Sequence, residues 1–263
     1  MICEERLMIL LKRLVGNIFD ACGQSPTIYN FVTKFLIMVL KRFGFNNISH
    51  ATNCEDLMVS FYTGKEKGFY VDIGALDPVK YSNTYLLYMK GWRGINIEPR
   101  KDCMERFLRY RQDDINLNIG IDVDKKVLKY YSFEEPAYNT ILKERAEHVI
   151  YEGYSRLIEE YEIYVSPLSS IFSEYLPQNQ QIDFLAIDVE GYEYNVLLSN
   201  DWTLYRPKFI AMESLISKGY GYDMNCLKKD RAVNFLLKNG YAVVGKIRNK
   251  LFFLDKSYVV ESI

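Results

Sequence analysis

Apolar and polar positions alternate in blocks along most of the chain, and the blocks predict strands and helices in turn. Five short apolar runs have the composition of buried strands: 68–75, 93–99, 115–121, 182–189 and 207–214. Amphipathic, helix-forming segments occupy 83–91, 101–112 and 230–240. The last stretch, 241–255, predicts a hairpin that turns near Arg248 and Asn249. This order predicts a mostly parallel α/β sheet with helices on both faces and an antiparallel hairpin at one edge.

Two regions depart from this alternation. Residues 1–48 form two predicted helices separated by the sequence CGQSPT, and they constitute an N-terminal helical extension to a domain at 49–263, which itself begins with a helix near Cys54–Tyr62. The connection 121–181 is too long for a simple crossover, and we expect it to contain a strand at 127–133, a helix at 144–161 and a β segment at 161–168. Insertions of this size in α/β enzymes often form the acceptor pocket.

Composition and charge narrow the class of protein. The chain has 263 residues, 49% of them hydrophobic and 25% charged, which is typical of a globular protein, and its net charge of −1 gives no sign of a nucleic-acid partner. Five scattered cysteines with no CxxC pair predict a reduced, cytoplasmic protein without a disulfide framework or zinc site. The apolar run 35–40 is too short to span a membrane. The N-terminal helices are therefore expected to pack on the domain or on a second copy in a homodimer.

The residues at the strand ends point to a cofactor. A dinucleotide fold would place G-x-G-x-x-G after the first strand, but only Gly74 is present and Leu76 and Val79 occupy the other positions. Asp72 would repel a phosphate and attract a cation. Glu98 ends the second strand, where an acid accepts hydrogen bonds from ribose hydroxyls. Together they favour S-adenosylmethionine, which carries a ribose and positive charge but no phosphate. An NAD(P)-dependent oxidoreductase and a non-catalytic binding module on the same fold stay as alternatives.

Acidic residues also gather at the ends of the fourth and fifth strands. Asp188 and Glu190 follow one strand and Glu213 ends the next, where desolvated carboxylates are costly unless they are paired, protonated or bound to a cation. Neighbouring strand ends with hard oxygen ligands predict a Mg²⁺ or Mn²⁺ site that activates a hydroxyl. Without a metal, Asp188 or Glu190 would act directly as the general base. Glu193 is assigned to the following helix, near its N-terminal end.

Three separated motifs resemble one family. The segments GFYVDIGALDPVKYSNTYLLYMKGWRGINIEP, IDFLAIDVEGYEYNVL and RPKFIAMES occur in this order and are similar to the FkbM family of S-adenosylmethionine-dependent methyltransferases, over about 49–215. The resemblance implies a class I methyltransferase (Rossmann-like) fold with a mostly parallel seven-stranded sheet. It also implies O-methylation of a sugar, such as a nucleotide-linked sugar or a glycan precursor of surface polysaccharide biosynthesis.

The resemblance also implies roles for individual residues. The cofactor turn would consist of Asp72, Gly74 and Ala75, with Glu98 on the ribose and Ile119 beside the adenine. Independently of the resemblance, Asp188 is expected near the sulfonium, because it ends the strand next to the first one in such sheets. Residues Ser82, Asn83 and Thr84 would contact the methionine part or the acceptor, although Ser82 is equally suited to capping a helix. From the residues of the insertion alone, the acceptor candidates are Tyr138, Asn139, Thr140 and Arg145. His148 is a candidate base or sugar contact, with a solvated or structural histidine as the alternative.

Overall fold

The computed structural model describes residues 25–42, 49–216, 227 and 229–260. The chain divides into two units, 1–48 and 49–263, and each is described by itself. The described part of the first unit is one helix, α2 (Pro26–Arg42), which is the second of the two helices predicted there. The first predicted helix lies outside the described residues, and the homodimer contact through this unit stays a prediction.

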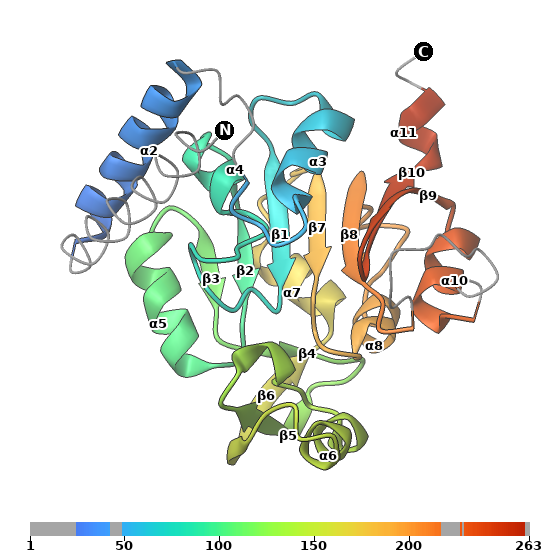
Figure 1. Cartoon of the computed structure of the whole chain (residues 1–263). Helices are drawn as coiled ribbons and strands as arrows, with labels where there is room; N and C mark the ends of the chain where they lie inside the picture. The colour runs from blue at the N-terminus through green and yellow to red at the C-terminus, as the bar shows by residue number, and fades with distance from the viewer. Residues whose placement is uncertain (1–24, 43–48, 217–226, 228, 261–263) are drawn as a thin grey trace, which may run out of the picture. The chain divides into compact units, whose positions relative to one another are not determined.

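The larger unit is built on one seven-stranded sheet (Figure 1). Its order is β3 (Ile115–Leu117), β2 (Arg93–Ile97), β1 (Phe69–Ile73), β7 (Phe184–Ile187), β8 (Phe209–Glu213), β10 (Lys250–Asp255) and β9 (Tyr241–Ile247). The first five strands are parallel to one another, and β10 is antiparallel to both of its neighbours. The predicted fold class, a Rossmann-like mixed sheet with a hairpin at one edge, is confirmed.

Helices cover both faces of this sheet, and its central strands β1, β7 and β8 are buried at every position. On one face, β1, β7 and β8 pack against α7 (Leu168–Tyr175), α8 (Glu193–Leu198) and α10 (Arg231–Lys238). On the other face, they pack against α3 (Glu55–Thr63) and the end of α4 (Tyr85–Met89). Successive side chains of a strand point to opposite faces, so Val71 joins the first cluster and Tyr70 the second. The remaining helices are α5 (Lys101–Tyr110) and α11 (Lys256–Val260).

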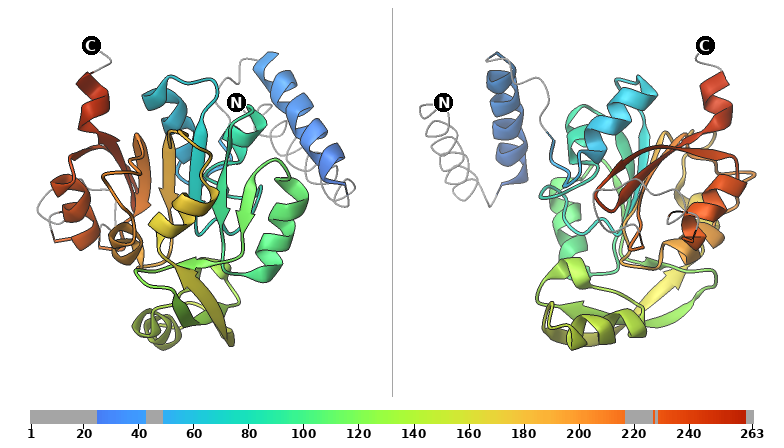
Figure 2. Two further views of the ribbon diagram at one scale, coloured as in Figure 1. Left: turned by 180° about the vertical axis from the view of Figure 1, so that it is seen from behind. Right: turned by 45° about the vertical axis from the view of Figure 1, so that its right-hand side comes forward.

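The insertion forms a second, smaller sheet. Its order is β4 (Gly120–Ile121), β6 (Leu157–Ser166) and β5 (Lys126–Phe133), with a 3₁₀ turn, η1 (Pro136–Tyr138), and the helix α6 (Lys143–Tyr151) beside it. Figures 1 and 2 show this sheet and α6 beyond the carboxyl ends of the central strands. The insertion is therefore placed where an open α/β sheet binds its ligands.

Two sequence-based assignments of elements are wrong. The helix predicted for 144–161 ends at Tyr151, because Gly153 adopts φ +67° and the chain then enters β6, whose residues pair with β5. The single strand predicted for 115–121 is divided between the two sheets. At the break, the side-chain amide of Asn118 donates to the backbone oxygens of Glu98 and Pro99, at 3.0 and 2.9 Å, in place of a strand neighbour.

The described helices include none that is long and apolar enough to cross a membrane. Cys54 and Cys103 both have free thiols.

Candidate active site

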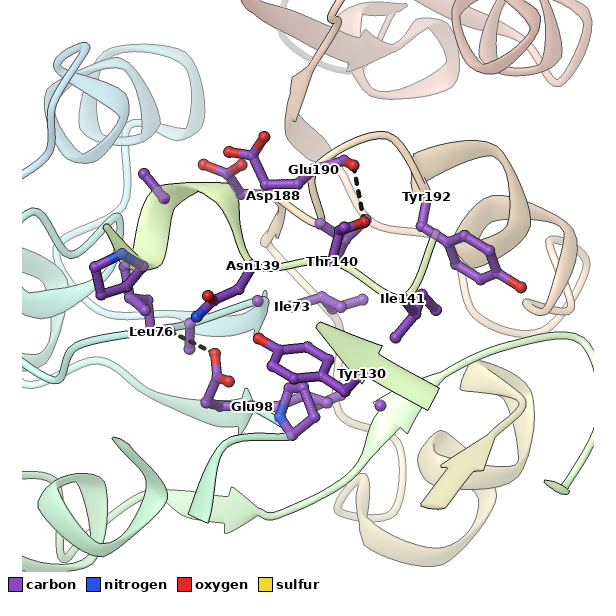
Figure 3. Close-up of a pocket in the computed structure, with 18 of the residues that line it drawn as sticks. Ile73, Leu76, Glu98, Tyr130, Asn139, Thr140, Ile141, Asp188, Glu190 and Tyr192 are labelled. Carbon is purple, nitrogen blue, oxygen red and sulfur yellow. Dashed lines mark hydrogen bonds between the residues drawn. The ribbon is translucent and has the colours of Figure 1, made fainter. Parts of the chain in front are cut away.

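A pocket of about 500 Å³ opens at the carboxyl ends of β1, β2 and β7 (Figure 3). Its walls come from the turn after β1, the ends of β2 and β7, and the insertion. The candidates named from the sequence that line the pocket are Gly74, Ala75, Asn83, Glu98, Ile119, Asn139, Thr140, Asp188 and Glu190. The fold thus brings residues from five separate segments to one cavity.

Gly74 brings the first strand's turn against the end of β7. It adopts φ +75°, and its N–H donates to the backbone oxygen of Ile97 at 3.0 Å. A Cβ added to Gly74 would lie 2.0 Å from the backbone oxygen of Asp188, which is closer than any real contact. Only glycine fits this position, because the turn after β1 packs directly against the backbone at the end of β7.

Glu98 presents its carboxylate to the pocket from the end of β2. It is buried, and each oxygen accepts one backbone N–H, from Arg100 at 2.8 Å and from Leu76 at 3.0 Å. Burial raises the pKa of Glu98 to about 7, against the lowering effect of these hydrogen bonds. Each oxygen retains a lone pair for a ligand hydroxyl, which is the arrangement that ribose binding requires.

Asp72 lies in β1, just before the turn that contains Gly74, and is fully buried. Its Oδ2 accepts from the hydroxyl of Thr84 at 2.9 Å, while Oδ1 has no hydrogen-bond partner among the described residues. Burial raises the pKa of Asp72 to about 6. Asp72, Ser82 and Thr84 are not part of the pocket wall. The Ser82 hydroxyl accepts the N–H groups of Thr84 at 3.3 Å and of Tyr85, the first residue of α4, at 3.1 Å, so Ser82 holds the turn that leads into that helix.

Arg111 connects these parts from within the protein, and the sequence did not single it out. Its side chain is fully buried and forms an ion pair with Asp114 at 3.0 Å. It also donates to the backbone oxygen of Pro78 at 2.9 Å, to the Thr84 hydroxyl at 3.0 Å and to the Tyr70 hydroxyl at 2.6 Å. One guanidinium therefore ties β1, the turn after it and the start of α4 together.

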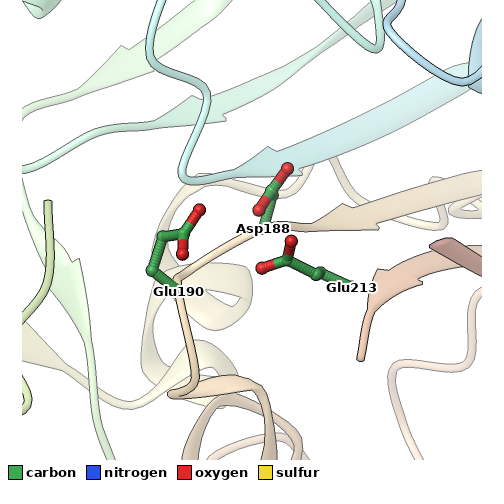
Figure 4. Close-up of side chains that lie close together, drawn as sticks. All are labelled: Asp188, Glu190 and Glu213. Atoms are coloured by element: carbon green, nitrogen blue, oxygen red, sulfur yellow. The ribbon is translucent and has the colours of Figure 1, made fainter. Parts of the chain in front are cut away.

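The three acids predicted at the strand ends do meet. Asp188, Glu190 and Glu213 each offer a carboxylate oxygen, and these oxygens lie within 4.8 Å of one another (Figure 4). A buried cation lies beside them. Lys250 is the cross-strand partner of Glu213, and its ammonium lies 2.5 Å from Oδ2 of Asp188.

The acids of this cluster influence one another's ionisation. Burial and the charge of Asp188 raise the pKa of Glu190 to about 7, while an ion pair with Arg145 at 3.1 Å opposes the shift. Burial and the charges of Asp188 and Glu190 raise the pKa of Glu213 to about 10, which favours the protonated form of this carboxyl. Burial lowers the pKa of Lys250, but the surrounding carboxylates more than reverse this effect and keep it charged.

The loop after β7 has an unusual backbone that presents these acids. Glu190 adopts φ +49°, a conformation that non-glycine residues rarely adopt, and Gly191 follows at φ +100°. Glu193 closes the loop, because its Oε1 accepts the N–H groups of Val189 at 3.3 Å and Gly191 at 3.2 Å. Glu193 is the first residue of α8, as predicted. The strain at Glu190 coincides with its place in the pocket wall.

The acceptor candidates of the insertion divide into two groups. Asn139 and Thr140 line the pocket, and the Thr140 hydroxyl donates to the backbone oxygen of Glu190 at 3.3 Å. Tyr138 and Arg145 lie outside the pocket wall, although Arg145 reaches Glu190. His148 is exposed on α6, where its ring lies against Tyr154 with centroids 5.9 Å apart, and it does not line the pocket.

Several residues of the site were not predicted from the sequence. The insertion also lines the pocket with Tyr130 and Ile163, and the loop after β7 adds Tyr192. Lys250 could have been suspected, since it is a lysine at the start of the apolar strand KLFFL, and a lysine buried in such a strand needs a charged partner.

A comparison with protein-family models decides the family. The model of the methyltransferase FkbM domain matches residues 72–243, which is more than half of the chain. The chain belongs to the FkbM methyltransferase family. The matched range of this FkbM protein runs from Asp72 of β1 into β9 and includes Gly74, Glu98 and the loop after β7, whereas Lys250 follows it. None of the curated proteins compared with the chain matches it.

Proposed function

We propose that this protein is an S-adenosylmethionine-dependent O-methyltransferase that acts in the cytoplasm on a hydroxyl of a sugar. The acceptor class is a nucleotide-linked sugar or glycan precursor of surface polysaccharide biosynthesis. The observation that carries the proposal is the pairing of the glycine turn after β1 with the carboxylate of Glu98 on one pocket. Membership of a methyltransferase family supports it.

The residues present fit this cofactor. Gly74 lines the pocket and has no side chain, so a ligand can lie against its backbone there. Glu98 offers acceptors for a ribose, because each of its oxygens accepts only one backbone N–H. When bound, S-adenosylmethionine supplies a methyl group on a positively charged sulfur. The turn after β1 lacks the glycine-rich loop that binds the pyrophosphate of an NAD(P) cofactor, since Leu76 and Val79 occupy its later glycine positions.

Glu190 is the proposed general base, with Asp188 beside it. Methyl transfer forms a bond between the acceptor oxygen and the methyl carbon, breaks the carbon–sulfur bond, and leaves that electron pair on sulfur. The hydroxyl proton passes to the carboxylate of Glu190. A pKa of about 7 suits this role at neutral pH, because the group is ionised often enough and still binds a proton well.

In this proposal, the side chains of Lys250 and Arg145 take the place of the metal ion that the sequence predicts. Asp188, Glu190 and Glu213 are close enough together to coordinate an ion. However, the ammonium of Lys250 already pairs with Asp188, and the guanidinium of Arg145 pairs with Glu190. A divalent ion at these acids would have to displace these two cations or tolerate their positive charge. We therefore propose catalysis by a direct base, the second of the two sequence-based alternatives.

Calorimetric titration with S-adenosylhomocysteine, NAD⁺ and NADP⁺ tests the cofactor. We expect micromolar binding of S-adenosylhomocysteine and none of either dinucleotide. Binding of a dinucleotide without binding of S-adenosylhomocysteine would instead establish the oxidoreductase alternative.

A further inference from the structure

Asn139 carries a buried amide whose nitrogen has no partner. Its side chain is 7% exposed, and its Oδ1 accepts the N–H of Phe133 at 2.7 Å. A backbone N–H binds only an acceptor, so this contact identifies the oxygen end of the amide and leaves Nδ2 at the other. Nδ2 has no hydrogen-bond partner in the part of the chain that the structure describes. A buried N–H of this kind is costly without a partner, and a ligand in the pocket would supply one.

The segment around Asn139 is fixed to the small sheet. The N–H of Asn139 donates to the backbone oxygen of Pro136 at 3.1 Å. The next residue, Thr140, exchanges two backbone hydrogen bonds with Tyr131 of β5, at 3.2 and 2.9 Å. With backbone bonds on both sides and Phe133 on its oxygen, the amide of Asn139 is held in one orientation.

Asn139 and Thr140 point to different parts of the pocket, as Figure 3 shows. The Thr140 hydroxyl points to the loop after β7, where it donates to the backbone oxygen of Glu190. The amide of Asn139 points instead toward the part of the pocket that contains the carboxylate of Glu98. Asn139 is therefore on the cofactor side of the cavity rather than at the acids.

The chemistry of Glu98 and Asn139 is complementary. An ionised carboxylate only accepts hydrogen bonds, whereas a ribose hydroxyl has one donor and two lone pairs. Once the hydroxyls donate to Glu98, their oxygens require a donor, and Nδ2 of Asn139 provides two N–H groups. Tyr130 of β5 also points its hydroxyl into this region (Figure 3). Burial and the charge of Glu98 raise the pKa of Tyr130 well above its usual value, so it too remains a donor.

We propose that the side-chain amide of Asn139 donates a hydrogen bond to a ribose hydroxyl of the cofactor, opposite Glu98. The insertion then completes the cofactor site, whereas the sequence assigned Asn139 to the acceptor. This inference rests on the proposed function, since it requires an adenosine-containing cofactor in the pocket.

The test is calorimetry with S-adenosylhomocysteine and with its analogues that lack the 2′- or the 3′-hydroxyl. Asn139→Asp keeps the shape and the acceptor for Phe133 but replaces the donor with an oxygen. We expect it to weaken S-adenosylhomocysteine binding about tenfold, the effect of losing one hydrogen bond. For one of the two analogues, the difference between variant and wild type should fall to less than about twofold. Asn179→Asp, the same change in an exposed turn, should bind like the wild type.

Two results would overturn the inference. One is equal binding of S-adenosylhomocysteine by Asn139→Asp and wild type, including the case in which only the KM of the acceptor changes. The other is an equal loss for S-adenosylhomocysteine and both analogues. If Asn139→Asp does not fold, the side-chain amide NMR signals of wild-type Asn139 must shift on adding S-adenosylhomocysteine, and an unchanged signal overturns the inference. Failure of the wild type to bind S-adenosylhomocysteine would contradict the proposed function itself.

Discussion

Gly74 and Asp188 are in backbone contact across the ends of β1 and β7, with room for a hydrogen but not for a methyl group between them. A Cβ at position 74 would lie 2.0 Å from the Asp188 backbone oxygen. Next to this contact the N–H of Asp188 donates to the backbone oxygen of Ile73 at 3.0 Å, so the cofactor turn and the loop that presents the acids begin at paired strand ends.

Gly74→Ala should therefore abolish cofactor binding while the protein still folds with reduced stability. Calorimetry should show at least about a hundredfold weaker binding of S-adenosylhomocysteine, equivalent to about 3 kcal/mol. Gly153→Ala is the matched control, because Gly153 also has positive φ (+67°) but has open space around its Cβ position. It should cost only the backbone strain of about 1 to 2 kcal/mol in stability and bind normally. Normal binding by Gly74→Ala would show that the contact does not shape the site.

The position of Gly74 and Glu98 was predictable because both follow from local sequence. Each stands at the end of an apolar run, and the carboxyl ends of parallel strands meet at one edge of the sheet. Asp188, Glu190 and Glu213 were brought together by the same rule.

Lys250 and Arg111 could not be placed in this way. Lys250 is 62 residues from Asp188 and meets it only through the pairing of β10 with β8. Arg111 follows an amphipathic helix, where a solvated arginine is the usual outcome, and its burial depends on the packing of β1, α4 and α5. The insertion was misassigned in part because 144–161 is compatible with a helix, and only pairing with β5 selects a strand.

Arg111→Met should destabilise the protein strongly. The variant leaves Asp114 without its buried ion-pair partner and removes donors to Pro78, Tyr70 and Thr84. Breaking a buried pair from one side costs about 3 to 5 kcal/mol, which urea denaturation should measure. Arg106→Met removes an exposed arginine that pairs with Asp77 and should cost less than about 1 kcal/mol. Equal stability of the two variants would show that the buried ion pair and hydrogen bonds of Arg111 do not stabilise the protein.

The pH dependence of turnover tests Glu190 as the base. The base must be ionised, so kcat should be low in acid, rise as pH passes through about 7 and level off above it. Arg145 lowers the pKa of Glu190 and Asp188 raises it. Arg145→Met should therefore move the rise in kcat to higher pH, and Asp188→Asn should move it to lower pH. If Glu190→Gln keeps the wild-type profile, another group is the base.

Removal of metal tests the assignment of Lys250 as the cation of the acid cluster. The wild type should keep its full turnover in EDTA. Lys250→Met should cost roughly 3 kcal/mol of stability, the lower end for a broken buried ion pair because Asp188 is partly exposed. Lys129→Met, at an exposed ion pair of β5, should have little effect. If EDTA abolishes wild-type activity and Mg²⁺ or Mn²⁺ restores it, a metal ion takes part in catalysis.

Transfer of a labelled methyl group from S-adenosylmethionine to a panel of sugars, nucleotide-linked sugars and glycan precursors tests the central claim most directly. The account predicts a base-stable methyl ether on one sugar hydroxyl and one S-adenosylhomocysteine per methyl group, with kcat lowered at least about a hundredfold in Glu190→Gln, the loss typical of removing a general base. Transfer of the label to a nitrogen or a carboxylate, or none to any sugar by an enzyme that binds S-adenosylhomocysteine, would contradict it.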